Sequence, residues 1–212
     1  MSNLVSGLLS NLRNTVILSS IIALVVVGGY MQHARGVDAT FVQTVLDATF
    51  VQAVLRFLHL VFGIMWIGLL YYFNFVQLRK MPEIPAELKP AVSKYIAPEA
   101  LFWFRWAALL TWVAGVLLAY NRGYLVDAFA LGLTSGNPQH SFIGLGMWLA
   151  TVMFFNVWVF IWPNQKIALG IVEADADAKA KAAKTAMLFS RLNTFLSIPM
   201  LATMGMNQTI FG

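Results

Sequence analysis

The sequence contains no cysteine, few charged residues and only three histidines among 212 residues. Without cysteine the chain can form no disulfide, no thiolate metal site and no CxxCH attachment motif, so haem c is excluded. Charged residues make up 11% of the chain and hydrophobic residues 59%, whereas soluble domains average about 25% and about 45–50%. This composition excludes an ordinary soluble domain and indicates an integral membrane protein.

Five long apolar runs account for most of the chain. A bilayer core about 30 Å thick needs about 20 mostly apolar residues per helix, and such runs occur at about residues 15–31, 51–77, 100–120, 141–162 and 186–206. The first run has no small-residue cleavage motif and is interpreted as a retained anchor. We therefore expect an all-α fold, a single domain over residues 1–212 that forms a bundle of about five transmembrane helices in the lipid bilayer.

Basic residues are concentrated in two of the connecting segments, residues 79–98 and 163–185. They are Arg79, Lys80, Lys89, Lys94, Lys166, Lys179, Lys181 and Lys184. With five spans both segments fall on one side, which the positive-inside rule makes cytoplasmic. The N-terminus is then cytoplasmic and the C-terminus periplasmic, and the net charge of +5 gives no reason to expect a nucleic-acid partner.

A nine-residue repeat precedes the second span, with DATFVQTVL at 38–46 followed by DATFVQAVL at 47–55. Nine residues make two and a half helical turns, so the copies would face opposite ways. We expect two short helical pieces with Asp38 and Asp47 as N-caps.

His59 stands inside an apolar run, LRFLHLVFGIMWIGLLYYF at 55–73. Helical spacing places it on one face with Arg56, Gly63 and Trp66. This pattern suits a b-type haem, with His59 as axial ligand, Gly63 leaving room for the macrocycle and Arg56 pairing with a propionate. The alternative is that His59 hydrogen-bonds a neighbouring helix, while Gly63 and Trp66 are packing contacts.

All three histidines, His33, His59 and His140, fall toward the predicted outer side. Because imidazole suits copper and zinc, they could instead hold one of these metals. The sequence leaves open which histidine would complete an iron or copper site, and it identifies no catalytic residue.

Polar residues at the predicted inner side suggest an anion site. Arg105 and Arg191 lie near the inner ends of spans three and five. Three amides, Asn74, Asn156 and Asn193, lie at similar depth. Guanidinium and amide groups could together hold a planar anion. The alternative is that both arginines extend to the lipid headgroups.

Four blocks together resemble a known family. They are LRFLHLVFGIMWIGLLYYF, KYIAPEALFWFRWAALLTWVAG, ATVMFFNVWVFIWPNQK and SRLNTFLSIPMLATM, at 55–73, 94–115, 150–166 and 190–204. In order and spacing they resemble the N-terminal membrane domain of the bacterial membrane-bound urate oxidase (urate hydroxylase) family, from about residue 51. The resemblance implies a multi-pass protein of the bacterial inner membrane that passes electrons from urate to a periplasmic cytochrome c, with His59, Trp66, Asn156 and Asn193 at matching positions.

The chain differs from this pattern in three ways. It is a short form without the cytochrome c domain, it lacks a pair of helices before the fourth span, and Gly144 and Leu192 stand where the family pattern has histidines. Two functions follow. The first is a redox protein with haem b at His59 that accepts electrons from a urate-like or quinone-like anion. The second is a non-catalytic accessory subunit that binds other membrane subunits or a second copy of itself.

Overall fold

The computed structural model describes residues 10–35 and 47–212, and within these ranges the regular structure is entirely helical. No strand occurs in the described part of the chain, which confirms the predicted all-α fold. The chain divides into two compact units, Met1–Val54 and Leu55–Gly212, which are described separately. The first copy of the nine-residue repeat lies outside the described residues.

The first unit contains helix α2, Leu12–Arg35. Its start is marked by Asn11, whose side-chain oxygen accepts a hydrogen bond of 3.3 Å from the backbone nitrogen of Asn14. Such caps satisfy backbone donors that lack a partner in the first helical turn. The long run of Val, Ile and Leu that follows contains the predicted first span.

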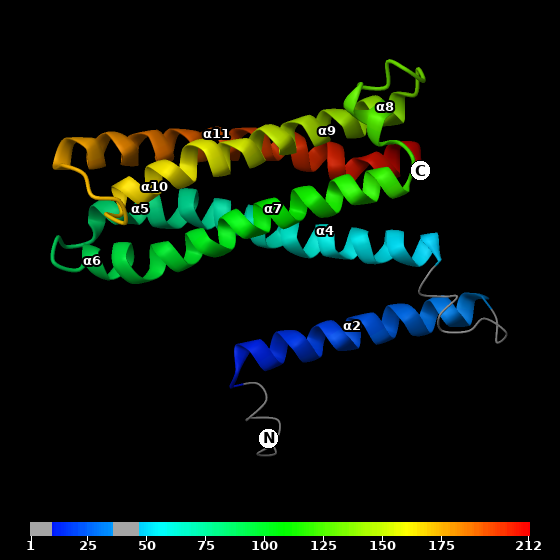
Figure 1. Ribbon diagram of the computed structural model, residues 1–212, viewed down its shortest axis with the longest axis horizontal. Helices are drawn as coiled ribbons and strands as arrows, with labels where there is room; N and C mark the ends of the chain where they lie inside the picture. Colours follow the sequence, from blue (N-terminus) through cyan, green and yellow to red (C-terminus); the bar gives the residue numbers. More distant parts are fainter. Residues whose placement is uncertain (1–9, 36–46) are drawn as a thin grey trace. The chain divides into compact units, whose positions relative to one another are not determined.

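The second unit is built from four long helical rods joined by short connections (Figure 1). The helices are α4 (Ala48–Tyr71), α5 (Leu78–Lys80), α6 (Lys89–Ala91), α7 (Ala97–Asn121), α8 (Leu125–Phe129), α9 (Pro138–Phe155), α10 (Trp162–Ala168) and α11 (Ala176–Phe211). Asp47 caps α4 as predicted, because its carboxylate accepts from the backbone nitrogen of Thr49 at 2.7 Å. Residues 176–185 of the second basic segment form the first turns of α11, which Asp175 caps, and residues 163–168 belong to α10.

Three of the rods contain a π-helical segment, in which backbone hydrogen bonds span five residues instead of four. These segments are η1 (Tyr72–Gln77), η3 (Val92–Ile96) and η4 (Asn156–Ile161). η1 joins α4 to α5, η3 joins α6 to α7, and η4 joins α9 to α10. A short 3₁₀ turn, η2 (Met81–Glu83), ends the first rod.

The bundle is held by one main apolar core, in which Trp66, Leu70, Phe104, Met153 and Val157 are almost fully buried. α11 packs along α9, η4 and α10. Unlike the other rods, it buries a row of polar residues, Ser190, Asn193, Ser197, Thr203 and Asn207. Small and polar residues allow close helix approach and interhelical hydrogen bonds.

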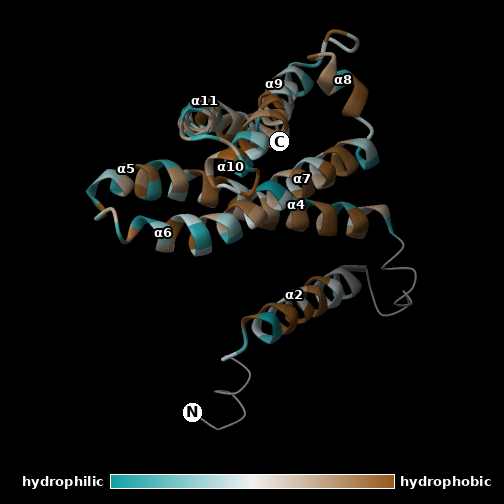
Figure 2. Cartoon of the chain, turned by 60° about the vertical axis from the view of Figure 1, so that its left-hand side comes forward, coloured by the Kyte–Doolittle hydropathy of each residue, from teal (hydrophilic) through white to brown (hydrophobic). Residues whose placement is uncertain are grey.

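Four helical stretches in the described residues are long and apolar enough to cross a membrane: Leu12–Tyr30, Ala48–Glu83, Lys89–Asn121 and Pro138–Ala168. Figure 2 shows apolar residues dominating α2 and α4, with polar residues gathered around α5 and α6. The chain is therefore a multi-pass membrane protein. The fifth predicted span, 186–206, lies within α11 but is not apolar enough to qualify, because it contains the exposed Arg191 as well as the buried polar row. The membrane orientation of the termini stays a prediction.

Candidate functional site

His59 projects from α4 onto α7. Its Nδ1 lies 2.9 Å from the carbonyl oxygen of Thr111. Because a carbonyl can only accept, Nδ1 carries the proton and Nε2 keeps its lone pair. The ring lies against Gly115, where an added Cβ would stand 2.8 Å from the ring carbon between the two nitrogens and 2.9 Å from Nδ1. A side chain at position 115 would therefore displace the imidazole, so the glycine forms a notch that fits the ring.

The neighbours predicted on the face of His59 make separate contacts. At Gly63 an added Cβ would lie 3.7 Å from the Thr111 methyl group, so this glycine meets α7 at an ordinary packing distance. Trp66 is 1% exposed, and its indole nitrogen has no hydrogen-bond partner within the described part of the chain. Arg56 is exposed and donates from Nη1 to Gln208 Oε1 at 2.9 Å.

These contacts agree with the predicted role of His59 as a ligand but not with the space predicted for the macrocycle beside Gly63. A metal-ligating histidine usually donates its other ring nitrogen to a carbonyl or carboxylate, and His59 does so while Nε2 has no hydrogen bond among the described residues. The space predicted beside Gly63 is instead occupied by Thr111. Haem binding at His59 therefore stays a prediction, and the hydrogen bond that orients the imidazole supports it.

His140 and His33 do not join His59 in a described cluster. His140 Nδ1 donates to Asp127 Oδ2 at 2.6 Å, and His33 lies exposed on α2 in the first unit. Within residues 10–35 and 47–212 no group of three or more His, Cys, Asp or Glu residues could hold a metal ion. Copper or zinc binding by the histidines therefore stays a prediction.

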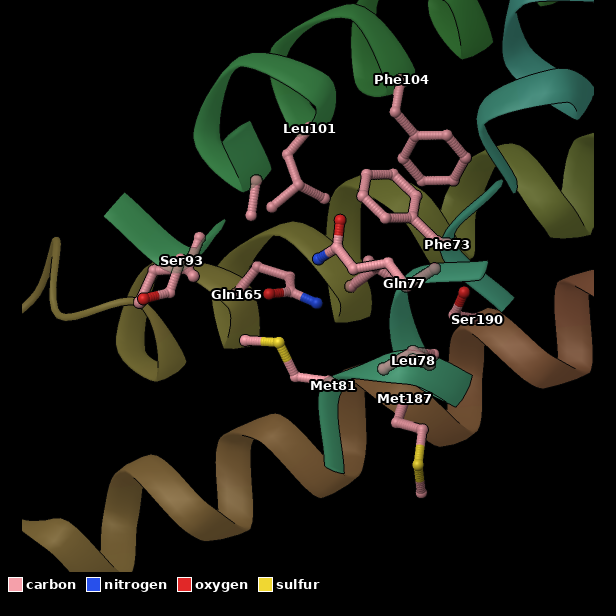
Figure 3. A pocket seen from close by; sticks show the side chains of 13 residues that line it. Phe73, Gln77, Leu78, Met81, Ser93, Leu101, Phe104, Gln165, Met187 and Ser190 are labelled. Atoms are coloured by element: carbon pink, nitrogen blue, oxygen red, sulfur yellow. The ribbon is translucent and has the colours of Figure 1, made fainter. Parts of the chain in front are cut away.

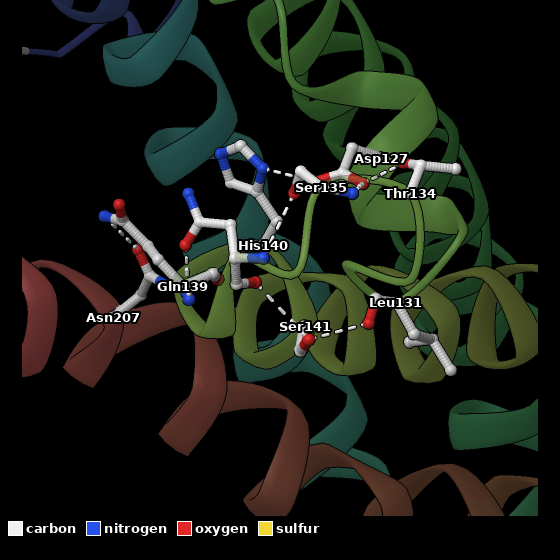
Figure 4. A network of polar contacts seen from close by, with 9 residues as sticks. Asp127, Leu131, Thr134, Ser135, Gln139, His140, Ser141 and Asn207 are labelled. Atoms are coloured by element: carbon white, nitrogen blue, oxygen red, sulfur yellow. Dashed lines mark hydrogen bonds and ion pairs between the residues drawn. The ribbon is translucent and has the colours of Figure 1, made fainter.

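Asp127, on α8, is the centre of a polar network that the sequence did not reveal (Figure 4). Its carboxylate accepts from the hydroxyls of Thr134 and Ser135, from the Ser135 backbone nitrogen at 3.0 Å and from His140. Hydrogen bonds from Ser135 and Thr134 hold the pKa of Asp127 well below its ordinary value, with a smaller effect from His140. The His140 ring stacks on Tyr124, with centroids 5.5 Å apart.

Asn156 and Asn193, predicted as substrate-binding residues, are bonded to each other. Asn156 Nδ2 donates to Asn193 Oδ1 at 2.8 Å, and Asn193 Nδ2 donates to the Met153 carbonyl at 2.9 Å. Both side chains are buried between α11 and the α9–η4 rod. These two hydrogen bonds join α11 to the α9–η4 rod.

The two arginines predicted beside these amides lie elsewhere. The Arg105 guanidinium carbon stands 3.9 Å from the ring centroid of Trp162, a cation–π contact between α7 and α10. Arg191 is exposed. Neither arginine lines the cavity described next.

A cavity of about 70 Å³ lies among η1, η3, α7, the η4–α10 junction and α11 (Figure 3). Its walls are Phe73, Gln77, Leu78, Met81, Ser93, Ala97, Leu101, Phe104, Ile161, Gln165, Leu169, Met187 and Ser190. All three π segments contribute to it. No residue from the sequence-based site predictions is among these thirteen.

The cavity residues were missed because each is an ordinary polar or apolar residue by itself. One signal was present: Ser190, Asn193 and Ser197 repeat at helical spacing within the fifth apolar run, which indicates a polar face turned to a neighbouring helix. No spacing in the sequence pointed to Asp127 as the partner of His140.

Comparison with known proteins gives one match. Residues 126–209, less than half of the chain, match the family model described as urate oxidase N-terminal. No curated protein and no solved structure matches the chain. The matched segment contains the blocks at 150–166 and 190–204, and it also contains Asn156, Asn193, Asp127 and His140. The blocks at 55–73 and 94–115, including His59, lie outside it.

The match confirms the recognised resemblance over α8, α9, η4, α10 and most of α11. These elements include the buried amide pair and the buried polar row of α11. The match over residues 126–209 supports membership of the chain in the urate oxidase N-terminal domain family.

Proposed function

We propose that the chain is a redox subunit of the bacterial inner membrane in which His59 holds a b-type haem. The observation that carries the proposal is the 2.9 Å hydrogen bond from His59 Nδ1 to the Thr111 carbonyl, with the ring set in the Gly115 notch. It fixes the tautomer and the ring orientation, and leaves the Nε2 lone pair for a ligand.

The chain's own residues have distinct roles in this proposal. Thr111 orients the imidazole and increases its basicity through the hydrogen bond. Arg56 uses only one guanidinium nitrogen for Gln208, so its other donors can meet a propionate. Haem, when bound, supplies a one-electron centre whose potential depends on its ligands and surroundings.

The substrate class in the proposal is an oxidisable anion of the urate or quinone type, and the electrons leave to an external carrier such as a periplasmic cytochrome c. Family membership supports this class. Arg105 on α7 and Arg191 on α11 supply positive charge for the anion. Asn156 and Asn193 hold η4 and α11 together through their hydrogen bond. Calorimetric titration with urate tests it: Arg105→Gln and Arg191→Gln should each weaken binding, and unchanged titrations would remove the arginines from the proposal.

An absorption spectrum tests the haem assignment. Protein purified from haem-replete cells should show a Soret band that His59→Ala removes. Asn164→Leu is the control, because Asn164 lies on α10, not on α4 or α7, and donates to the Phe160 carbonyl at 2.8 Å, and it should leave the band in place. A colourless wild-type preparation, or a band that survives His59→Ala, would contradict the proposal.

A second candidate is an accessory subunit that keeps the family's packing without its chemistry. The observation that favours it is the buried amide pair, in which both amide nitrogens donate to groups of the protein itself. This function predicts a colourless protein that copurifies with a larger membrane complex, and whose association is unaffected by His59→Ala.

A further inference from the structure

The cavity among the three π segments has no charged residue in its wall. Nine of its thirteen wall residues are apolar, and the four polar ones are Gln77, Ser93, Gln165 and Ser190. A charged ligand would lose its hydration without gaining a counter-charge there. The composition of the wall therefore selects an uncharged ligand.

The polar wall groups require a ligand that both donates and accepts hydrogen bonds. Gln77 Oε1 is buried and has no partner among the described residues. A buried acceptor without a donor costs about 1–3 kcal/mol, so a ligand N–H or O–H placed there would remove this cost. The Ser190 hydroxyl accepts from Asn74 Nδ2 at 2.8 Å, and this leaves its own proton available for a ligand carbonyl.

The carboxamides of Gln77 and Gln165 reach into the same space from different rods, as Figure 3 shows. Phe73 and Phe104 close one side, with ring centroids 5.6 Å apart in an edge-to-face contact. Polar groups thus occupy part of the wall while aromatic and aliphatic groups occupy the rest. Such a surface matches a molecule with one polar edge and an apolar body.

The size of the cavity limits the ligand further. A benzene ring of six heavy atoms binds in a cavity of about 150 Å³, or about 25 Å³ for each heavy atom. On that scale the 70 Å³ cavity takes about three heavy atoms. A haem, a purine or a quinone ring is too large, whereas a small amide fits.

We propose that this cavity is a binding site for a small uncharged amide of about three heavy atoms, such as formamide. A ligand N–H donates to Gln77 Oε1, and the ligand carbonyl accepts from the Ser190 hydroxyl. Water alone is the competing occupant, but each buried water typically makes about three hydrogen bonds, and nine of the wall residues are apolar. The π segments, which are frequent at functional sites, all meet at this cavity.

The test is ¹³C-methyl NMR of methionine-labelled protein titrated with formamide. Met81 and Met187 line the cavity, whereas Met206 lies exposed on α11 outside the wall. Formamide should shift the Met81 and Met187 signals with saturation and leave Met206 unchanged. Formate, which has nearly the same shape but a negative charge, should shift neither at the same concentration.

Variants locate the site. Gln77→Leu should weaken formamide binding at least tenfold, because the acceptor is lost. Ala97→Leu fills the cavity and should abolish binding. Asn164→Leu is the matched control: Asn164 lies beside Gln165 on α10, outside the wall, and donates to the Phe160 carbonyl at 2.8 Å. Its binding should match the wild type, and dispersed methionine signals verify that each variant is folded.

Three results would overturn the proposal. The first is an absence of shifts in the wild type, which would mean that the cavity holds water alone. The second is equal binding by folded Gln77→Leu. The third is a set of unsaturated shifts that includes Met206, which would indicate a solvent effect. None of these readouts depends on haem, so the redox proposal and this one can fail separately.

Discussion

Replacing Gly144 by alanine should force two helices apart, because the atoms nearest to Gly144 are backbone atoms of Ala128. Gly144 lies on α9 facing α8, and an added Cβ would stand 1.9 Å from the Ala128 carbonyl oxygen and 2.8 Å from its carbon. Even the tight limit of 3.0 Å requires a movement of about 3.0 − 1.9 = 1.1 Å. No side-chain rotation can supply it, so Gly144→Ala must push the two helices apart.

The magnitude follows from two opposing effects. Ala is favoured over Gly in a helix interior by about 1 kcal/mol, while overpacking costs about 1–3 kcal/mol and occasionally more. Because the obstacle at Gly144 is rigid, we expect the upper part of that range and a net loss of about 2 kcal/mol in the free energy of unfolding. Gly68→Ala meets nothing within 4 Å and should be neutral or stabilising.

Reversible unfolding in detergent, followed by circular dichroism, measures both variants. A local probe is also available, because Trp148 Nε1 donates to the Phe129 carbonyl on α8 at 2.9 Å. The indole N–H resonance of Trp148 should move in Gly144→Ala and stay in place in Gly68→Ala. Equal stability of the two variants, with an unmoved resonance, would refute the argument.

Three further outcomes follow from the site. Gly115→Ala should displace the imidazole of His59 and, in haem-loaded protein, shift or remove the Soret band; an unchanged spectrum would place the ligand elsewhere. Asn156→Leu and Asn193→Leu should each destabilise by about 1–3 kcal/mol, and the double variant by clearly less than the sum; additivity in unfolding titrations would deny their coupling. The pKa of Asp127 is lowered in the fold, so its contribution to stability is complete above the ordinary value of 3.8 and is lost as pH falls through the folded value. Acid titration of unfolding should therefore be shallower in Asp127→Asn than in the wild type, and parallel curves would contradict the assigned hydrogen bonds.

The spans were predictable because a membrane helix needs a long apolar run, and hydropathy reports this directly. The fifth run shows the limit of this approach. Ser190, Asn193 and Ser197 lower its apolarity, yet they are buried. Ser190 and Ser197 bond to the α4–η1 rod, and Asn193 bonds to η4. Hydropathy treats such residues as exposed to lipid, and cannot distinguish them from residues that face another helix.

The site was harder to predict for two reasons. The partner of His59 is the backbone carbonyl of Thr111, which no side-chain pattern reveals. The cavity depends on π segments, and an extra residue in a turn rotates everything after it by about 100° relative to the regular 3.6-residue period. Helical spacing counted from His59 therefore fails beyond Tyr72, and Gln77 could not be placed on the inner face.

The carboxylate of Asp127 has a consequence for the tolerance of the α8–α9 connection to inserted residues. It bonds to Ser135 and His140, so the end of this connection and the start of α9 are held to α8 at one point. The distance between the two helices is therefore set by these bonds and not by the length of the connection. Residues inserted between α8 and Thr134 should accordingly leave the rods on either side undisturbed.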